Sequence, residues 1–137
     1  MASVPISEVV AVAEFRAALR QFLRRTERIA RASGLTPQRY LLLLMVKGAA
    51  DGSERSTVTA LAERLQLAQS TVTELVSRAE EAGLLVREQS TKDARVAHLR
   101  LTEEGEQRLT RAFTTLAAER ANLRDAFAHL DSTISPT

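Results

Sequence analysis

A polar face on the segment 69–82 carries the side chains best suited to contacts outside the protein. At about 100° of rotation per residue, one side of this segment is apolar and the opposite side holds hydroxyl and charged groups. Small hydroxyl side chains let a helix enter the major groove of DNA, which is just wide enough to admit one. An ordinary amphipathic surface helix has the same pattern, so the face alone leaves both interpretations open. Its polar members are Ser70, Thr73, Glu74, Ser77, Arg78 and Glu81.

Two cations follow this segment, at or beside the tip of an expected β-hairpin. Residues 84–86 begin one strand, and residues 96–101 alternate apolar and polar side chains with the period of a second strand. The polar residues 89–94 make the turn, with Lys92 inside it and Arg95 beside it. A cation at a loop tip is usually only solvated. Two cations beside a groove-binding helix could instead reach phosphates or a minor groove.

The sequence shows no constellation for catalysis or for metal binding. It has no cysteine, and its two histidines, His98 and His129, lack neighbours at metal-ligand spacing. His98 fits a strand position better than a ligand position. There is no glycine-rich phosphate loop and no recognisable pair of nucleophile and base. We therefore expect a protein that is not an enzyme and has neither a cofactor nor a metal.

A helix-turn-helix must position the polar face. Thr57 is a candidate N-cap for a short helix that turns Leu61 and Leu65 inward. The turn 66–69 then leads into the polar helix, which ends at Gly83. With the hairpin behind it, this segment has the outline of a winged helix.

A more apolar helix precedes the helix-turn-helix. Thr36 and Pro37 supply a capping hydroxyl and a proline at the first helical position. The segment is apolar on almost all sides until Gly48, so we expect it to be the buried central helix. Residues 48–55 have the composition of a loop.

Two long amphipathic helices flank this lobe, over residues 7–33 and 103–130, with Ser7 and Thr102 as candidate N-caps. The second would be about 42 Å long at 1.5 Å per residue, more than so small a domain covers by itself. The apolar stripes therefore need a partner surface, and a second copy of the chain is the simplest supplier. The residues expected at this dimer interface are Phe15, Phe22, Leu109, Phe113, Leu116, Leu123, Phe127 and Leu130.

A length of 137 residues favours one domain over residues 1–137, and the patterns above predict that it is mainly α-helical with a small β-hairpin wing. The lobe spans 36–101, and the flanking helices form a dimerisation region. An apolar share of 45% is enough for a small core. The chain lacks a secretory signal and any run long enough for a membrane span, so we expect a cytoplasmic protein with no membrane partner.

Charge is distributed unevenly, although the net charge is only +2. Residues 1–56 carry nine basic and five acidic residues, whereas 57–101 carry six of each. Net charge therefore gives weak support for nucleic-acid binding. A row of arginines on the first helix is either a solvated face or a surface for phosphates or an acidic partner. The row comprises Arg16, Arg20, Arg24, Arg28 and Arg31.

Six short motifs occur in a fixed order along the chain. They are GLTPQRY at 34–40, TALAERLQL at 59–67, STVTELVSR at 70–78, GL at 83–84, DAR at 93–95 and LTEEG at 101–105. In this order and spacing, residues 34–109 resemble the MarR (multiple antibiotic resistance regulator) family of bacterial winged-helix transcription regulators.

The resemblance implies a homodimer that binds a pseudo-palindromic DNA operator, usually as a repressor, with release by a small and often aromatic ligand. Arg95 of the wing would enter the minor groove, and Asp93 would orient a nearby arginine. The candidate ligand pocket is Leu19, Leu23, Tyr40 and Leu44. The implied DNA-binding residues are Gln69, Ser70, Thr71, Thr73, Glu74, Ser77, Arg78, Lys92 and Arg95.

Two positions depart from the family pattern. Ala68 stands where a capping residue usually precedes the recognition helix, and Ala94 stands where a second basic residue often occurs in the wing. A missing cap costs about 1 kcal/mol. The neutral lobe and Glu74 leave open an alternative function, a winged-helix module for protein–protein contact or ligand sequestration without DNA binding.

Overall fold

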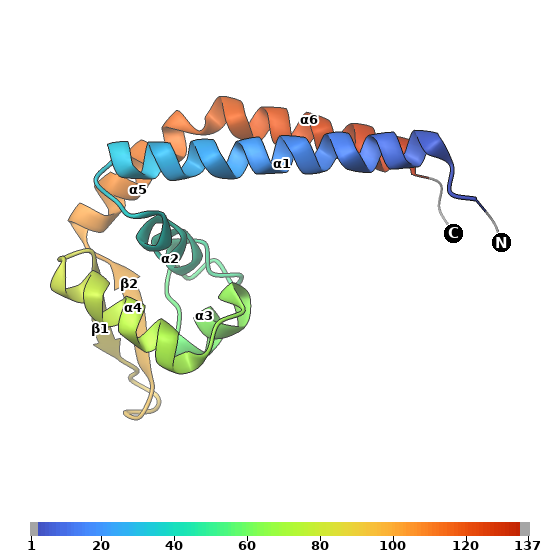
Figure 1. The fold of residues 1–137 in the computed structure, drawn as a ribbon. Helices are drawn as coiled ribbons and strands as arrows, with labels where there is room; N and C mark the ends of the chain where they lie inside the picture. Colours follow the sequence, from blue (N-terminus) through green and yellow to red (C-terminus); the bar gives the residue numbers. More distant parts are fainter. Residues whose placement is uncertain (1–2, 135–137) are drawn as a thin grey trace.

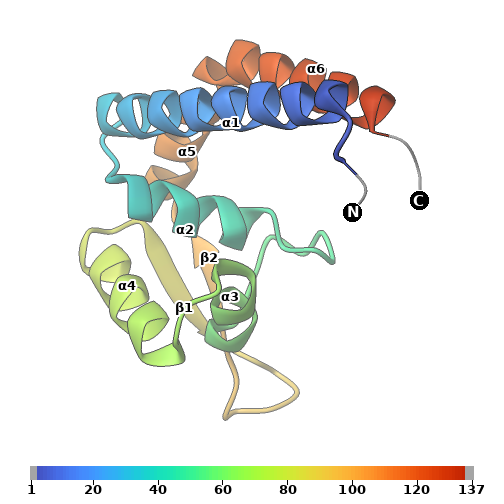
Figure 2. The same ribbon diagram turned by 45° about the vertical axis from the view of Figure 1, so that its right-hand side comes forward.

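A computed structural model of the chain, which describes residues 3–134, divides it into a helical lobe and a two-helix arm (Figure 1). The arm consists of the first and last helices, which lie side by side in both views, above the lobe that holds the remaining elements (Figure 2). The elements are α1 Ile6–Ala32, α2 Pro37–Lys47, α3 Val58–Leu65, α4 Gln69–Glu81, β1 Leu85–Gln89, β2 Ala97–Leu101, α5 Glu103–Thr115 and α6 Ala117–Thr133.

Three helices begin at the threonines that the sequence indicates. The side chains of Thr36, Thr57 and Thr102 each accept a hydrogen bond from the backbone N–H three residues ahead, at 3.1 Å. Each bond satisfies one of the unpaired N–H groups at a helix start. The predicted mainly helical fold with a hairpin wing is confirmed.

The core forms around α2, as its composition predicts. Leu42, Leu43 and Val46 are fully buried, while Leu41 on the outer side of α2 stays exposed. The apolar faces of α3, α4 and the hairpin close over α2 together with α5. Their buried side chains include Leu61, Val72, Val76, Ala79, Leu84, Leu99, Leu101, Leu109 and Leu116.

The hairpin has a third partner, Ser56, which lies between the predicted loop 48–55 and the cap of α3. β1 and β2 pair antiparallel, with Arg87 opposite Leu99. Ser56 then pairs with Leu99 on the other side: Ser56 N donates to Leu99 O at 3.1 Å, and Leu99 N donates to Ser56 O at 2.8 Å. These two bonds fix the base of the wing to the residue next to the start of α3.

The single C-terminal helix predicted over 103–130 is wrong, because the chain bends at Leu116. α5 ends there with φ −83° and ψ 4°, and α6 begins at the next residue. Leu116 is buried in the lobe, whereas α6 packs along α1. Arg120 braces the bend, since its Nη1 donates to Phe113 O at 2.6 Å and its guanidinium lies 3.7 Å from the centre of the Phe113 ring.

The arm is an antiparallel pair of helices. The rings of Phe15 and Phe127 meet edge-on at 6.2 Å, and nearer the lobe Arg25 pairs with Glu119 at 3.6 Å. α1 begins at Ile6 with Pro5 at its N-cap position, so Ser7 lies inside the helix and is not its cap. Pro5 offers no capping side chain, and its carbonyl oxygen accepts the first helical bonds, from Glu8 N and Val9 N.

Within residues 3–134, no helix is long and apolar enough to cross a membrane. The ends of the predicted single domain, at residues 1 and 137, lie outside the described residues.

Candidate nucleic-acid interface

The helix α4 presents its polar face away from the core. Val72, Val76 and Ala79 are fully buried and hold the opposite side of the helix against the lobe. At its start, Ala68 makes no side-chain capping bond, as expected for alanine. Gln69 Nε2 donates to Thr59 Oγ1 at 3.4 Å and so links the first turn of α4 to α3.

The seven residues of α4 that the family resemblance implies for DNA binding are all exposed. Thr73 donates its hydroxyl to Gln69 O at 2.8 Å, within the helix. Within residues 3–134, the hydroxyls of Ser70, Thr71 and Ser77 make no hydrogen bond to the chain. A hydroxyl both donates and accepts hydrogen bonds. These three groups can therefore form hydrogen bonds with a ligand that contacts this face.

Glu74 and Arg78 form an ion pair on the same face. Glu74 Oε1 lies 2.6 Å from Arg78 Nη2, one helical turn away. The two charges cancel at the centre of the face. The sequence predicts that the residues share a face, but it does not reveal that they bind each other.

The wing tip is organised by its own side chains. Ser90 Oγ accepts hydrogen bonds from the backbone N–H groups of Lys92 and Asp93, at 3.2 and 3.3 Å. Asp93 Oδ1 accepts from Arg95 N at 3.0 Å and from Arg95 Nε at 3.2 Å. These bonds from Arg95, first the backbone and then the side chain, lower the pKa of Asp93. Lys92 and Arg95 extend into solvent, the Arg95 side chain being 91% exposed.

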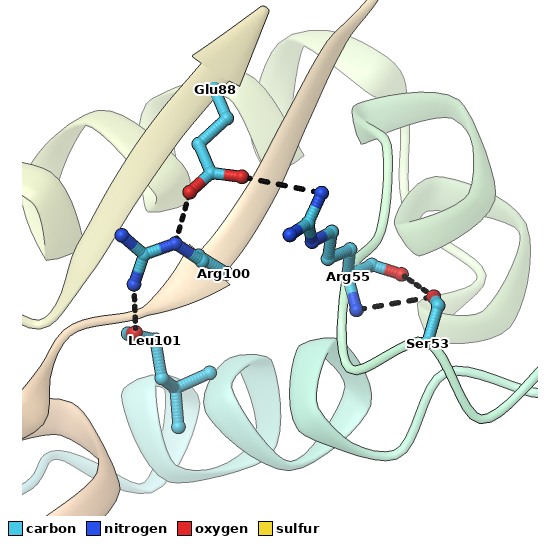
Figure 3. A network of polar contacts seen from close by, with 5 residues as sticks. All are labelled: Ser53, Arg55, Glu88, Arg100 and Leu101. Atoms are coloured by element: carbon cyan, nitrogen blue, oxygen red, sulfur yellow. Dashed lines mark hydrogen bonds and ion pairs between the residues drawn. The ribbon is translucent and has the colours of Figure 1, made fainter. Parts of the chain in front are cut away.

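A charged cluster at the base of the wing was not anticipated from the sequence (Figure 3). Glu88 on β1 is placed between Arg100 on β2, which donates to its Oε1, and Arg55, whose Nη1 lies 3.4 Å from its Oε2. The hydrogen bond from Arg100 is the main reason why the pKa of Glu88 is lowered. Glu88 and Arg100 become neighbours only once the hairpin register is known, and Arg55 only through the pairing of Ser56 with Leu99.

The four residues predicted to line a ligand pocket are not brought into one hollow. Leu19 and Leu23 line a surface hollow of about 520 Å³ along α1, together with Arg16, Arg20 and Arg24. Tyr40 and Leu44 do not line it. Tyr40 is buried in the core, where burial raises the pKa of its hydroxyl, and Leu44 packs against that core.

The residues predicted at a dimer interface fall into two groups. Leu109 and Leu116 are 5% and 1% exposed, because they belong to the core of the single chain. They therefore have almost no side-chain surface left for a partner. Phe113 and Phe127 are 45% and 56% exposed. Phe15, Phe22, Leu123 and Leu130 are partly exposed along the arm.

Comparison with known proteins points to one family of winged-helix proteins. The model of the MarR family matches residues 33–96. The HTH-type transcriptional repressor MdtR of Bacillus subtilis is 38% identical over 73 residues, which make up 53% of this chain and 44% of MdtR. The chain therefore spans less than half the length of this curated relative.

Two solved structures show how far the fold extends. The Mycobacterium tuberculosis transcriptional regulator MOSR, solved in complex with DNA, is 26% identical, with a TM-score of 0.59 over 80% of this chain and 77% of that one. AbsC of Streptomyces coelicolor, a MarR family transcriptional regulator, is 22% identical, with a TM-score of 0.65 over 99% of this chain and 86% of that one. The likeness to AbsC covers the arm as well as the lobe, so the two parts together match one known fold.

Proposed function

We propose that this chain is a transcription regulator of the MarR family that binds double-stranded DNA through α4 and the wing, on the strength of the family match over residues 33–96 and the similarity to MdtR. The observation that carries this proposal is the exposed face of α4, with three hydroxyls that are unused within residues 3–134. In both ribbon views, α4 and the hairpin turn lie at the end of the lobe away from α1 and α6 (Figures 1 and 2). One duplex could therefore meet both elements.

In this proposal α4 reads base edges in the major groove and the wing reaches an adjacent minor groove. Ser70, Thr71 and Ser77 are small enough to let the helix approach base edges closely. Arg95 extends from a turn that Asp93 holds in shape. A narrow minor groove attracts such a cation. The remaining contacts would come from Gln69, Thr73, Glu74, Arg78 and Lys92.

The working unit in this proposal is a homodimer. The arm keeps large apolar side chains exposed, among them Val9, Leu23 and Phe127, and Phe113 is exposed nearby on α5. Large exposed apolar side chains that gather on one surface commonly mark a protein–protein interface. A two-fold dimer would hold two copies of α4 at a fixed distance and so select a pseudo-palindromic operator.

Repression in the cytoplasm is the proposed mode of regulation, with binding to the nucleoid when the protein occupies DNA. The relative MdtR is a repressor by name, which supports this sign of regulation. Release by a small aromatic ligand is the proposed control. The apolar part of its site would begin with Leu19 and Leu23, which line the hollow on α1. We propose no enzymatic activity.

A winged-helix module for protein–protein contact is the second candidate function. The pairing of Glu74 with Arg78 favours it, because it cancels charge where a DNA-binding face would benefit from a net positive charge. Measured binding to a defined duplex separates the two functions.

The test is a mobility-shift titration with the duplex upstream of the protein's own gene and a scrambled duplex of equal length. The proposal predicts a complex with the upstream duplex at nanomolar to low micromolar protein, and a weaker one with the control. Binding to neither duplex would favour the second function, and equal binding to both would contradict sequence-specific recognition.

A further inference from the structure

The ion pair between Glu74 and Arg78 occupies the middle of the exposed face of α4. Each side chain keeps 62% of its surface exposed, and the two charged groups are 2.6 Å apart. An exposed ion pair of this kind adds little to folding stability. Stability therefore does not account for an acidic residue at the centre of a face that meets a polyanion.

Both partners keep unused hydrogen-bonding capacity. A guanidinium has five N–H donors. Within residues 3–134, Arg78 uses only Nη2 in a side-chain hydrogen bond, and Glu74 accepts only through Oε1. The remaining donors of Arg78 and the Oε2 atom of Glu74 lie on the exposed side of the helix, where a ligand can reach them.

These groups match the edges of a G·C pair in the major groove. Guanine presents two acceptors, O6 and N7, which suit arginine, and cytosine presents the N4 donor, which suits a carboxylate. Four residues advance a helix by about 6 Å, a little less than two base steps of about 3.4 Å. The contact between the two side chains draws their charged ends closer than that.

We propose that Glu74 and Arg78 act as one reader of guanine and cytosine. Arg78 donates to O6 and N7 of a guanine, and Glu74 accepts from N4 of a cytosine in the same or the next base pair. Glu74 also holds the guanidinium in position for this contact. The inference rests on the proposed function, because it requires α4 to enter the major groove.

Glu74 supplies the discrimination by rejecting the other bases. A carboxylate has no donor, so it is repelled by O4 of thymine and by O6 and N7 of guanine. Adenine offers the N6 donor, but its N7 acceptor lies beside it and repels the second carboxylate oxygen. A glutamine at this position has both a donor and an acceptor, which is the pattern that pairs with adenine N6 and N7.

The test is selection of duplexes from a random pool by three proteins: wild type, Glu74→Gln and Glu81→Gln. Glu81 is exposed on the same helix, so Glu81→Gln removes the same charge while leaving the Glu74–Arg78 pair intact. We expect wild type and Glu81→Gln to enrich the same site with a G·C step. Glu74→Gln should replace its cytosine with adenine, and competition binding should show a shift in preference of about tenfold or more.

Two results would overturn the inference while leaving the proposed function intact. One is an identical enriched site for wild type and Glu74→Gln. The other is a gain in affinity of Glu74→Gln that is uniform across sequences. That result would mean that the negative charge of Glu74 only weakens binding to DNA in general. Failure of wild type to enrich any duplex would instead overturn the proposed function, and the inference with it.

Discussion

Asp93 accepts three hydrogen bonds from Arg95 at the tip of the wing, the longest from Nη2 to Oδ2 at 3.5 Å. One carboxylate oxygen of Asp93 accepts from the backbone N–H of Arg95 at 3.0 Å and from its Nε at 3.2 Å. The exposed cation is thereby tied to the turn that carries it. Asp93 can affect DNA affinity in two opposite ways. Its negative charge repels phosphates and lowers the affinity, whereas its hold on Arg95 positions a cation that would bind phosphates and raises the affinity.

The variant Asp93→Asn separates these two effects. Loss of a negative charge alone would strengthen binding to DNA. If Asp93 positions Arg95, we expect DNA affinity to fall by about two- to fivefold, the scale of an exposed ion pair. Fluorescence anisotropy with the selected duplex measures the change. A rise in affinity would contradict the positioning role.

The same pair predicts a pH dependence. Because the folded protein lowers the pKa of Asp93, the ionised carboxylate contributes stability above the pKa of the unfolded state. That contribution is lost as the pH falls through the lowered, folded value. We expect an NMR titration of the Asp93 carboxyl carbon to have its midpoint below that of an unstructured aspartate. A midpoint at or above the ordinary value would contradict the contacts with Arg95.

Gly105 is required by close approach of two backbone segments. A Cβ at this position would lie 2.3 Å from Leu84 O, which already accepts from Thr102 N at 3.0 Å. Alanine is the better helix former by about 1 kcal/mol, yet we expect Gly105→Ala to lower the free energy of unfolding by about 1–3 kcal/mol through overpacking.

Urea unfolding measures this effect, with Thr110→Ala as the control. Thr110 is exposed on the same helix, so alanine there should be neutral or slightly stabilising. If both variants had the same midpoint urea concentration as wild type, the close approach of α5 to Leu84 would be contradicted.

A substitution at Ala68 is expected to raise the stability of the fold, unlike the one at Gly105. It occupies the N-cap position of α4 in an extended conformation, with φ −63° and ψ 147°, and supplies no capping bond. We expect Ala68→Ser to raise the free energy of unfolding by about 1 kcal/mol, because its hydroxyl can accept from an unpaired N–H of the first turn. Ala82→Ser, at the other end of the helix, supplies the control. Equal unfolding midpoints for the two variants would exclude the capping effect.

The exposed Phe127 ring and the other exposed apolar side chains of the arm predict self-association. We expect sedimentation at micromolar concentration to give about twice the 15.0 kDa chain mass. Phe127→Asp should shift it toward the monomer, because Phe127 keeps 56% of its surface exposed on α6. Leu41→Asp, a comparably exposed site on α2 of the lobe, is the matched control. A monomeric wild-type protein would contradict the proposed dimer.

Local features of the fold were predictable from the sequence, whereas features that join distant segments were not. The caps at Thr36, Thr57 and Thr102 depend on contacts three residues away, so the sequence displays them. The pairing of Ser56 with Leu99 joins residues far apart in the chain. A single pair leaves no periodic pattern in the sequence, so nothing in the sequence indicated this pairing.

The bend at Leu116 was missed for a different reason. Leu109, Phe113 and Leu116 continue the apolar spacing of a helix, so the pattern passes through the bend without interruption. The sequence cannot show that Leu116 faces the core of its own chain, while Phe113 faces outward under the Arg120 guanidinium. The same limit explains why two core residues were assigned to the dimer interface.

The exposure of the proposed site residues was predictable from the sequence. All nine residues predicted to contact DNA are exposed, on α4 and at the wing tip. Their pairing was not predictable, because the contact between Glu74 and Arg78 depends on rotamers. The ion pair between Glu88 and Arg100 depends on the hairpin register.

The most direct test of DNA binding through α4 and the wing is the salt dependence of affinity for the selected duplex, measured with wild type and Arg95→Ala. We expect the logarithm of the association constant to fall linearly with the logarithm of salt concentration, with a slope of about −0.9 per phosphate contacted. In Arg95→Ala the affinity should drop, and the slope should become shallower by about one unit for each copy of the wing that contacts a phosphate. Unchanged affinity and slope in the variant would contradict the role of the wing, and the absence of salt-dependent binding by wild type would contradict the account as a whole.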